Sequence, residues 1–427
     1  MRHAPIPSRL FRHNRDRLRA LLPGNALAVV NANDVLPTNA DGSLVMVPNS
    51  DLFYLTGIEQ EESVLLIAPD AIDGKQREIL FIRESNEQLR TWEGDKLTRG
   101  EAGRISGVQR VEGLSAFPAI FRQLMCDSEQ IFLNSNEHRR AVLEVDTRDA
   151  RFIRETQAAY PLHQYHRLAR LMHRLRVEKS EDEIELIRRA CEITRDGFRR
   201  VLRKVKPGVN EYDLEAEFAH EFIRNRAKFA YPPIVASGAN ACVLHYLEND
   251  KPCRKGDLLL LDVGASYANY NADMTRTLPV SGKFTRRQRQ VYHSVLYVLR
   301  TMCQTAMPGV LHRDWQRQAD ALMTEELLKL GLLKPGEVKR QDPDKPACKK
   351  YFMHGLGHPL GLDVHDVGFM SDPFSPGWVL TVEPGIYIPA EGFGIRLEND
   401  IVVTEDGPID LMADIPIEAE EIEALMN

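Results

Sequence analysis

Acidic and imidazole side chains gather in five short segments in the C-terminal half of this sequence. The segments are residues 258–262, 273–277, 354–366, 381–387 and 394–400, and each sets an acid or a histidine beside an apolar run. A carboxylate that is buried without a partner costs several kcal/mol or becomes protonated. Several such groups in one protein therefore predict that bound cations compensate their charge.

Two aspartates are predicted to lie side by side on a β-hairpin. Asp262 ends the apolar run 258–261, and Asp273 begins a segment that can return along it. Two adjacent carboxylates cannot both ionise cheaply without a compensating charge. For one isolated aspartate, a salt bridge to Arg276 or simple turn chemistry would be the favoured explanation.

Two glutamates show the same pattern further along the chain. Glu383 ends the apolar run 378–382, and Pro384 keeps it in an extended conformation. In the segment 394–400, alternation with a period of two places Arg396 and Glu398 on one face. The alternative for this second pair is an ion pair at the surface.

Three histidines, His354, His358 and His365, lie within the segment 354–366. Histidines four residues apart can share one face of a helix, as in zinc proteases. Two glycines between the first two histidines and the proline after them argue against a helix, and a glycine-rich loop lets the backbone approach a site closely. A single histidine is more often structural, whereas three among glycines favour a functional site.

One metal centre explains these residues together better than separate explanations do. The candidate ligands are four carboxylates and one imidazole: Asp262, Asp273, His358, Glu383 and Glu398. Two divalent cations would balance four carboxylates, and oxygen-rich ligation favours Mn²⁺, with Zn²⁺ and Co²⁺ as alternatives. Such ions lower the pKa of a water between them, so a metal-bridging hydroxide is the predicted nucleophile.

The bulk composition narrows the class of protein. The length of 427 residues favours two or three domains, and the net charge of −7 argues against a nucleic-acid-binding protein. No apolar stretch approaches the roughly 20 residues of a membrane helix, and the basic N-terminus does not resemble a secretory signal. The six cysteines form no Cys-x-x-Cys pair, so we expect free thiols and a reducing cytoplasm.

The N-terminal region, residues 1–172, is predicted to be a non-catalytic α/β domain with a mixed sheet. Predicted strands lie at residues 27–30, 44–47, 64–68 and 79–82. Helical patterns cover residues 10–22, 118–125 and 168–175.

The C-terminal region, residues 173–427, is predicted to be a duplicated catalytic domain. Capping boxes at Ser180 and Thr285 each begin a long helix, which stops before a Pro-Gly-Val sequence. From Pro207 and Pro308 onward the two copies share an offset of 101 residues, which favours duplication over chance. Each half would be a helix pair followed by antiparallel strands, and the halves would face each other across a cleft.

Four motifs follow one another along the C-terminal region: Asp262-x10-Asp273, His354-x3-His358-x6-His365, Glu383-Pro384-Gly385 and Arg396-x-Glu398. Together they resemble the proline-specific metallopeptidases of the pita-bread fold, and most closely Xaa-Pro aminopeptidase (aminopeptidase P). The run 49–57 also resembles the N-terminal domain of that family. The resemblance covers most of the chain and implies a dinuclear-metal aminopeptidase that hydrolyses the N-terminal Xaa-Pro bond of peptides.

The resemblance implies a role for each candidate ligand. Asp262 would bind one metal ion, Asp273 and Glu398 would bridge the two ions, and His358 and Glu383 would complete the second. Glu383 would also carry a proton during the reaction. The free amino group of the substrate would lie near the ion held by Asp262, which explains cleavage from the N-terminus.

The same resemblance implies residues that contact the substrate. His365 would stabilise the developing oxyanion, and His245 matches a histidine on the substrate side. His354 would line the pocket for the proline ring, and Arg396 would reach the peptide backbone beyond it. Trp92 would act at the active site of a neighbouring subunit, with ordinary packing as the alternative. A homo-oligomer, dimer or tetramer, is therefore expected.

Other interpretations share part of this pattern. A prolidase, which cuts only Xaa-Pro dipeptides, has nearly the same metal motifs. Methionine aminopeptidases lack the N-terminal domain and the extra His354, and creatine amidinohydrolases have the fold without needing these metals. A catalytically inactive pita-bread binding module would usually have lost ligands that are all present here.

Overall fold

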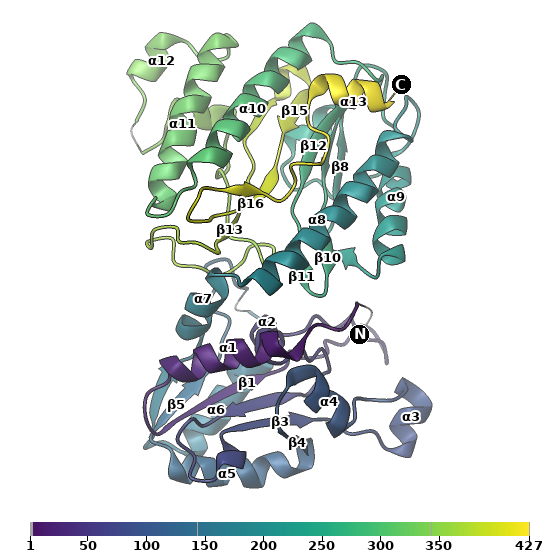
Figure 1. Ribbon diagram of the computed structural model, residues 1–427. Helices are drawn as coiled ribbons and strands as arrows, with labels where there is room; N and C mark the ends of the chain where they lie inside the picture. The colour runs from purple at the N-terminus through teal and green to yellow at the C-terminus, as the bar shows by residue number, and fades with distance from the viewer. Residues whose placement is uncertain (1–2, 143, 343, 427) are drawn as a thin grey trace. The chain divides into compact units, whose positions relative to one another are not determined.

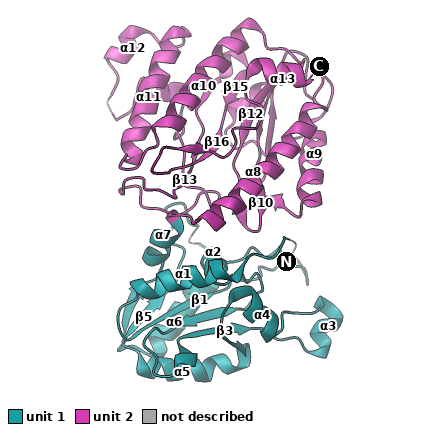
Figure 2. Ribbon diagram, in the orientation of Figure 1, with its two compact units in different colours: residues 1, 3–176 teal, residues 2, 177–427 magenta. Residues whose placement is uncertain are grey.

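The computed structural model describes residues 3–142, 144–342 and 344–426, which form two compact units (Figure 2). Unit 1 contains His3–Arg176, and unit 2 begins at Val177. The division falls within helix α7 (Ala169–Val177). The domain limits expected from the sequence, 1–172 and 173–427, stay a prediction.

Unit 1 is built on one six-stranded sheet with the order β4-β3-β2-β1-β5-β6 (Figure 1). Its strands are β1 (Ala26–Asn31), β2 (Val64–Ile67), β3 (Glu78–Ile82), β4 (Arg110–Gly113), β5 (Gln130–Leu133) and β6 (Gln164–Arg167). Strand β1 pairs antiparallel with β2 and parallel with β5, so the sheet is mixed, as predicted. Both faces of β1 and β2 are buried, which explains their continuous apolar sequences.

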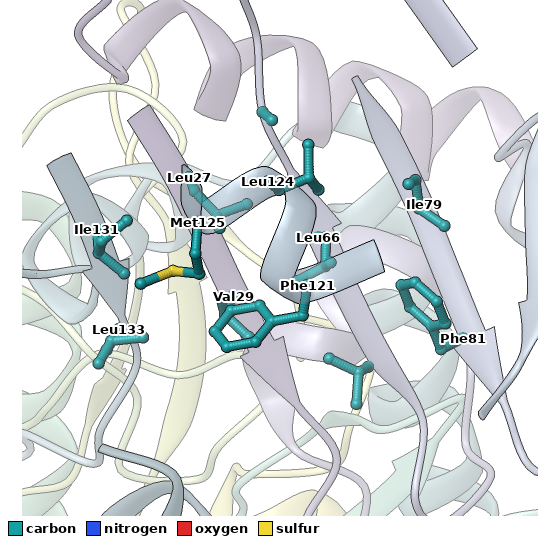
Figure 3. Close-up of a cluster of buried hydrophobic side chains, with 12 residues drawn as sticks. Leu27, Val29, Leu66, Ile79, Phe81, Phe121, Leu124, Met125, Ile131 and Leu133 are labelled. Carbon is teal, nitrogen blue, oxygen red and sulfur yellow. The ribbon is translucent and has the colours of Figure 1, made fainter. Parts of the chain in front are cut away.

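Unit 1 also contains helices, one of which supplies part of the core over the sheet. They are α1 (Ser8–Leu21), α2 (Ser50–Thr56), α3 (Glu87–Glu93), α4 (Arg99–Ser106), α5 (Phe117–Asp127), α6 (Arg148–Ala159) and α7. Phe121, Leu124 and Met125 of α5 belong to one buried cluster with Leu27 and Val29 of β1 (Figure 3). The period of α5 thus directs one apolar face onto the sheet.

The predicted strand at residues 44–47 is wrong. Val45 is 91% exposed, and the pairing that this loop makes is an isolated bridge between Pro37 and Ser43. An apolar run forms a strand only where neighbouring chain accepts its backbone hydrogen bonds. The other strands and helices predicted for this region are confirmed.

Unit 2 contains two long helix pairs, α8 with α9 and α10 with α11 (Figure 1). Its helices are α8 (Glu181–Leu202), α9 (Glu211–Arg224), α10 (Arg286–Thr305), α11 (His312–Lys329), α12 (Pro335–Lys339) and α13 (Ala419–Met426). The Glu183 carboxylate accepts hydrogen bonds from the backbone and hydroxyl of Ser180, both at 2.9 Å. Thr285 and Gln288 form the second capping box. The duplicated helix pair is therefore confirmed.

The strands of unit 2 form small sheets, and every pairing in its described part is antiparallel. They are β7 (Lys228–Phe229), β8 (Ile234–Ser237), β9 (Leu258–Asp262), β10 (Ala265–Tyr267), β11 (Tyr270–Asn271), β12 (Thr275–Pro279), β13 (Val379–Val382), β14 (Gly385–Ile388), β15 (Phe393–Arg396), β16 (Asn399–Val402) and β17 (Ile409–Asp410). The 3₁₀ turns of the chain are η1 (Gly74–Gln76), η2 (Leu114–Ala116), η3 (Gly238–Cys242), η4 (Ala347–Lys350) and η5 (Pro389–Glu391).

The antiparallel register sets acids from distant sequence positions side by side. Asp262, the last residue of β9, pairs with Thr275 of β12. The backbone N–H of Glu398 donates to the carbonyl of Thr275 at 3.0 Å. The carboxylates of both halves therefore meet where these strands end. None of the helices in the described ranges combines the length and apolar character that a bilayer span requires.

Candidate metal centre

Three predicted ligands form the centre of an acidic cluster in unit 2. Asp273, His358 and Glu398 each offer a ligand atom, and these atoms lie within 4.8 Å of one another. Asp273 and Glu398 are 5% and 2% exposed, whereas His358 is half-buried. Two buried carboxylates and one half-buried imidazole at this separation can hold a cation.

Asp262 joins the cluster through a tyrosine hydroxyl. The Tyr231 hydroxyl lies 2.6 Å from Asp262 Oδ1 and also contacts Asp273 Oδ1. Burial, followed by the charges of both aspartates, raises the pKa of Tyr231 well above its ordinary value, so the phenol keeps its proton. A neutral hydroxyl brings no net positive charge. Tyr231 therefore does not compensate the negative charges of Asp262 and Asp273.

The imidazole of His358 is oriented for ligation through Nε2. Its Nδ1–H donates to the carbonyl of Pro359 at 3.0 Å. Nε2 then faces Asp273 Oδ2 and Glu383 Oε1, each at 3.6 Å. A hydrogen bond at one ring nitrogen is the usual way to fix the tautomer of a metal-binding histidine. His358 thereby brings Glu383, the last of the five predicted ligands, into the cluster.

The electrostatics of the cluster fit a divalent cation. Burial raises the pKa of Asp273 well above its ordinary value, and Asp262 adds to the shift. Burial and the neighbouring Asp273 do the same to the pKa of Glu398. Without a metal, both acids therefore tend to hold a proton, and a bound cation could replace these protons. The oxygen-rich set of donor atoms suits hard or borderline ions.

Arg396 supplies one positive charge at the edge of the cluster. Only 4% of this residue is exposed, and its guanidinium contacts Asp262 Oδ2. It also donates to the Tyr387 hydroxyl at 2.8 Å and to the Thr275 hydroxyl at 3.0 Å. Thr275 in turn donates to Glu398 Oε2 at 2.6 Å. Arg396 and Thr275 therefore hold two of the predicted ligands in place.

His354 is a neutral, hydrogen-bonded imidazole beside the cluster. Because the Tyr387 hydroxyl accepts from Arg396, its own proton goes to His354 Nε2, at 2.8 Å. His354 Nδ1–H donates to the carbonyl of Gly355 at 2.8 Å and lies 3.7 Å from Glu383 Oε2. Burial, helped by the charge of Arg396, lowers the pKa of His354 to about 3. The ring therefore stays uncharged at neutral pH.

The remaining predicted site residues are more exposed. His365 is exposed, and its ring centroid lies 4.4 Å from that of His358. His245, also exposed, follows η3 and is close enough to His354 to influence its charge state. Trp92 lies on α3 of unit 1 and is 81% exposed.

The glycine-rich loop permits the close approach that the sequence predicted. It is not helical, and a Cβ atom on Gly357 would lie 1.9 Å from the carbonyl oxygen of Thr381. The backbone N–H of Thr381 donates to the carbonyl of His358 at 2.9 Å. Any larger residue at position 357 would push His358 away from the strand that supports it.

Four polar residues of the site were not found by sequence reasoning: Tyr231, Thr275, Tyr387 and Asp400. Thr275 and Asp400 each lie two positions after a predicted ligand, so period-two spacing could have found them. Asp400 is fully buried, and its Oδ2 accepts from the backbone N–H of Asp273 at 3.0 Å. Neither tyrosine has a comparable sequence signal.

Known proteins resemble this chain over nearly its whole length. Residues 185–405 match the model of metallopeptidase family M24, and residues 11–132 match the aminopeptidase P N-terminal domain. The chain is 37% identical to Xaa-Pro aminopeptidase of Escherichia coli over 97% of each protein. It is 32% identical to Xaa-Pro aminopeptidase 3 of Homo sapiens, over 93% of this chain and 80% of the human protein.

Two solved structures show the same similarity in three dimensions. Zn-substituted E. coli aminopeptidase P in complex with product has a TM-score of 0.87 and 36% identity, covering 99% of each chain. A variant of E. coli aminopeptidase P in complex with substrate has a TM-score of 0.87 and 35% identity over the same share of both chains.

Proposed function

The chain belongs to metallopeptidase family M24 and carries an aminopeptidase P N-terminal domain, and on this premise we propose that it removes the N-terminal residue from peptides with proline in second position. It is a hydrolase of the Xaa-Pro aminopeptidase type with the two-domain pita-bread fold. The observation that carries this conclusion is the buried cluster of Asp273, His358 and Glu398.

We infer that the centre binds two divalent cations, with Mn²⁺ favoured and Zn²⁺ and Co²⁺ as alternatives. The proposed ligands are Asp262, Asp273, His358, Glu383 and Glu398. One divalent cation would leave four carboxylates negative even with Arg396 counted, whereas two compensate them. Mostly oxygen ligands with one imidazole favour Mn²⁺ over metals that prefer sulfur.

The cations would lower the pKa of a shared water and polarise the scissile carbonyl. Glu383 is the proposed proton carrier, because its side chain is 21% exposed and that of Asp273 only 8%. It can therefore exchange protons with solvent and substrate, while the deeper acids hold charge in place. The free amino group of the peptide is proposed to lie near Asp262.

Three histidines and one arginine are proposed to hold the substrate. The neutral His354 has both ring nitrogens engaged, so its ring surface is what it offers to a proline ring. His245 and His365, both exposed, would contact the peptide and the developing oxyanion. Arg396 is bound to Asp262 here, and its contact with the peptide backbone stays a prediction.

We propose that the protein is cytoplasmic and assembles into a dimer or tetramer. All six cysteines are free, which supports a reducing cytoplasm. The exposed indole of Trp92 supports the proposal that unit 1 lends an aromatic ring to a neighbouring subunit in a dimer or tetramer. The molecular mass in solution tests this, since a strict monomer would rule out the contribution of Trp92.

The substrate experiment compares an Xaa-Pro dipeptide with an Xaa-Pro-Xaa tripeptide, with Xaa-Ala-Xaa as the matched control. We expect cleavage of the tripeptide at the Xaa-Pro bond and little turnover of the alanine peptide. Turnover confined to the dipeptide would establish a prolidase, which the named relatives do not favour. If no peptide were cleaved with any metal, the result would favour a catalytically inactive binding module.

A further inference from the structure

Helix α11 presents a polar ridge to the loop that carries His354 and His358. The ridge consists of His312, Gln316 and Asp320, which are four residues apart and therefore share one face of the helix. None of the three was among the predicted site residues. Each of them contacts the loop directly or through one further side chain.

The contacts engage successive backbone groups of the loop. His312 Nε2–H donates to the carbonyl of Gly357 at 3.0 Å. Gln316 Oε1 accepts from the backbone N–H of Leu356 at 2.7 Å, and Gln316 Nε2 donates to Asp320 Oδ1 at 2.9 Å. Asp320 Oδ1 also lies 2.8 Å from Lys349 Nζ, which donates to the carbonyl of His354 at 3.1 Å.

These bonds continue into the acidic cluster. The carbonyl of Leu356 accepts from the backbone N–H of Glu383 at 2.7 Å. A continuous chain of hydrogen bonds thus runs from Asp320 through Gln316 and Leu356 to Glu383. The Thr381 hydroxyl accepts from the backbone N–H of His358 at 3.1 Å. Strand β13 and helix α11 therefore both hold the loop.

The loop needs this support because it has no regular structure of its own. It contains two glycines, whose backbone freedom is costly to restrict. Leu356 is fully buried, so its backbone N–H would lose a necessary partner without Gln316. Aromatic rings fix the position of His312, which meets Trp315 and Phe374 edge-on, with ring centroids 6.0 and 6.4 Å away.

We propose that Gln316 and His312 are positioning residues for the metal centre, which set the separation between His358 and Glu383 by fixing the loop 354–358. Asp320 orients the Gln316 amide so that its oxygen faces Leu356. The ridge acts on the proposed ligands through the backbone of the loop, to which His312 and Gln316 are hydrogen-bonded. This inference rests on the proposed metal centre and names residues beyond those that bind it.

The test uses Gln316→Met, which keeps the length of the side chain but can neither accept from Leu356 nor donate to Asp320. The matched control is Gln318→Met, the same change at an exposed position of the same helix. His312→Phe is a second variant, since it keeps an aromatic ring against Trp315 and Phe374 but removes the donor to Gly357.

The readout is the affinity for Mn²⁺ alone, measured by calorimetry on chelator-treated protein, with metal-free melting temperature recorded for each variant. We expect Gln316→Met and His312→Phe to bind Mn²⁺ about tenfold more weakly, the low end of losses behind a metal ligand, with Gln318→Met unchanged. With saturating Mn²⁺, we expect kcat to fall while the KM for an Xaa-Pro-Xaa tripeptide stays within about twofold.

Wild-type Mn²⁺ affinity in both ridge variants would overturn the inference, even if their melting temperatures fell, because the ridge would then be structural only. If Gln316→Met does not fold, the affinity of His312→Phe decides the question. Wild-type protein that binds Mn²⁺ but cleaves no Xaa-Pro peptide would refute the proposed function instead, without bearing on the ridge.

Discussion

The variant Asp273→Asn should be more stable than the wild-type protein without metal. Once metal is added, it should be less stable than wild type. Asparagine has the same shape and can still accept from Tyr231, so the change removes charge with little change of volume. Ligand atoms of Asp273 and Glu398 lie within 4.8 Å. Two full charges at that distance repel by about 3–4 kcal/mol at an effective dielectric constant of about 20.

Protonation already relieves part of this repulsion in the wild-type protein, because the pKa values of both acids are raised. We therefore expect Asp273→Asn to gain about 1–3 kcal/mol of metal-free stability at pH 7, or about 2–10 °C in melting temperature. A raised folded-state pKa means that stability is lost as pH rises above the unfolded-state value. The advantage of the variant should consequently disappear below about pH 4, where the carboxyl is protonated in both states.

Added Mn²⁺ should reverse the order of stability. A ligand present at 100 times its dissociation constant stabilises the folded state by about 2.7 kcal/mol, and the variant lacks one of the proposed ligands for it. Thermal melts with and without Mn²⁺, with the exposed Asp406→Asn as control, measure both effects. The reasoning is refuted if Asp273→Asn is no more stable than wild type without metal, or if Mn²⁺ raises both melting temperatures equally.

Three further outcomes are expected. Glu383→Ala should abolish peptidase activity without lowering metal-free stability, and turnover near the wild-type rate would remove Glu383 from the proposed mechanism. A chelator should inactivate the enzyme, Mn²⁺ should restore it, and elemental analysis of the restored protein should give two ions per chain. In unit 1, burial raises the pKa of Asp149 to about 6, so its folded form loses stability as pH rises from about 4 to 6. Asp149→Asn should then be more stable than wild type by about 1–3 kcal/mol at pH 7 and equal to it near pH 3.5, measured by denaturant unfolding.

The four acids that the sequence proposed as ligands lie close together in the structure, and strand patterns carried the information about them. Asp262 follows four leucines, and Glu383 follows a run in which only Thr381 is polar, so both acids stand out in the sequence alone. The hairpin register then places Asp273 near Asp262, since antiparallel pairing leaves little choice of neighbour. The same logic failed at residues 44–47, where no neighbouring strand accepts the backbone hydrogen bonds.

The residues that sequence reasoning missed depend on contacts between elements that local patterns do not specify. Tyr231 precedes β8, and only the packed fold brings its hydroxyl between Asp262 and Asp273. Tyr387 is a buried strand residue of a kind that usually belongs to a hydrophobic core. Its hydroxyl instead joins Arg396 to His354, whose neutral state follows from burial and the charge of Arg396.

The polar ridge of α11 shows why helical patterns can mislead in an enzyme. Polar residues four positions apart ordinarily mark the face of a helix that meets water. From the sequence of α11 alone, His312, Gln316 and Asp320 would be predicted to face water in the same way. In the structure this face meets a glycine-rich loop, where Gln316 accepts from the backbone N–H of Leu356 and His312 donates to the carbonyl of Gly357. A polar stripe beside a predicted irregular loop is therefore a candidate support for that loop, and in this protein the loop carries a proposed metal ligand.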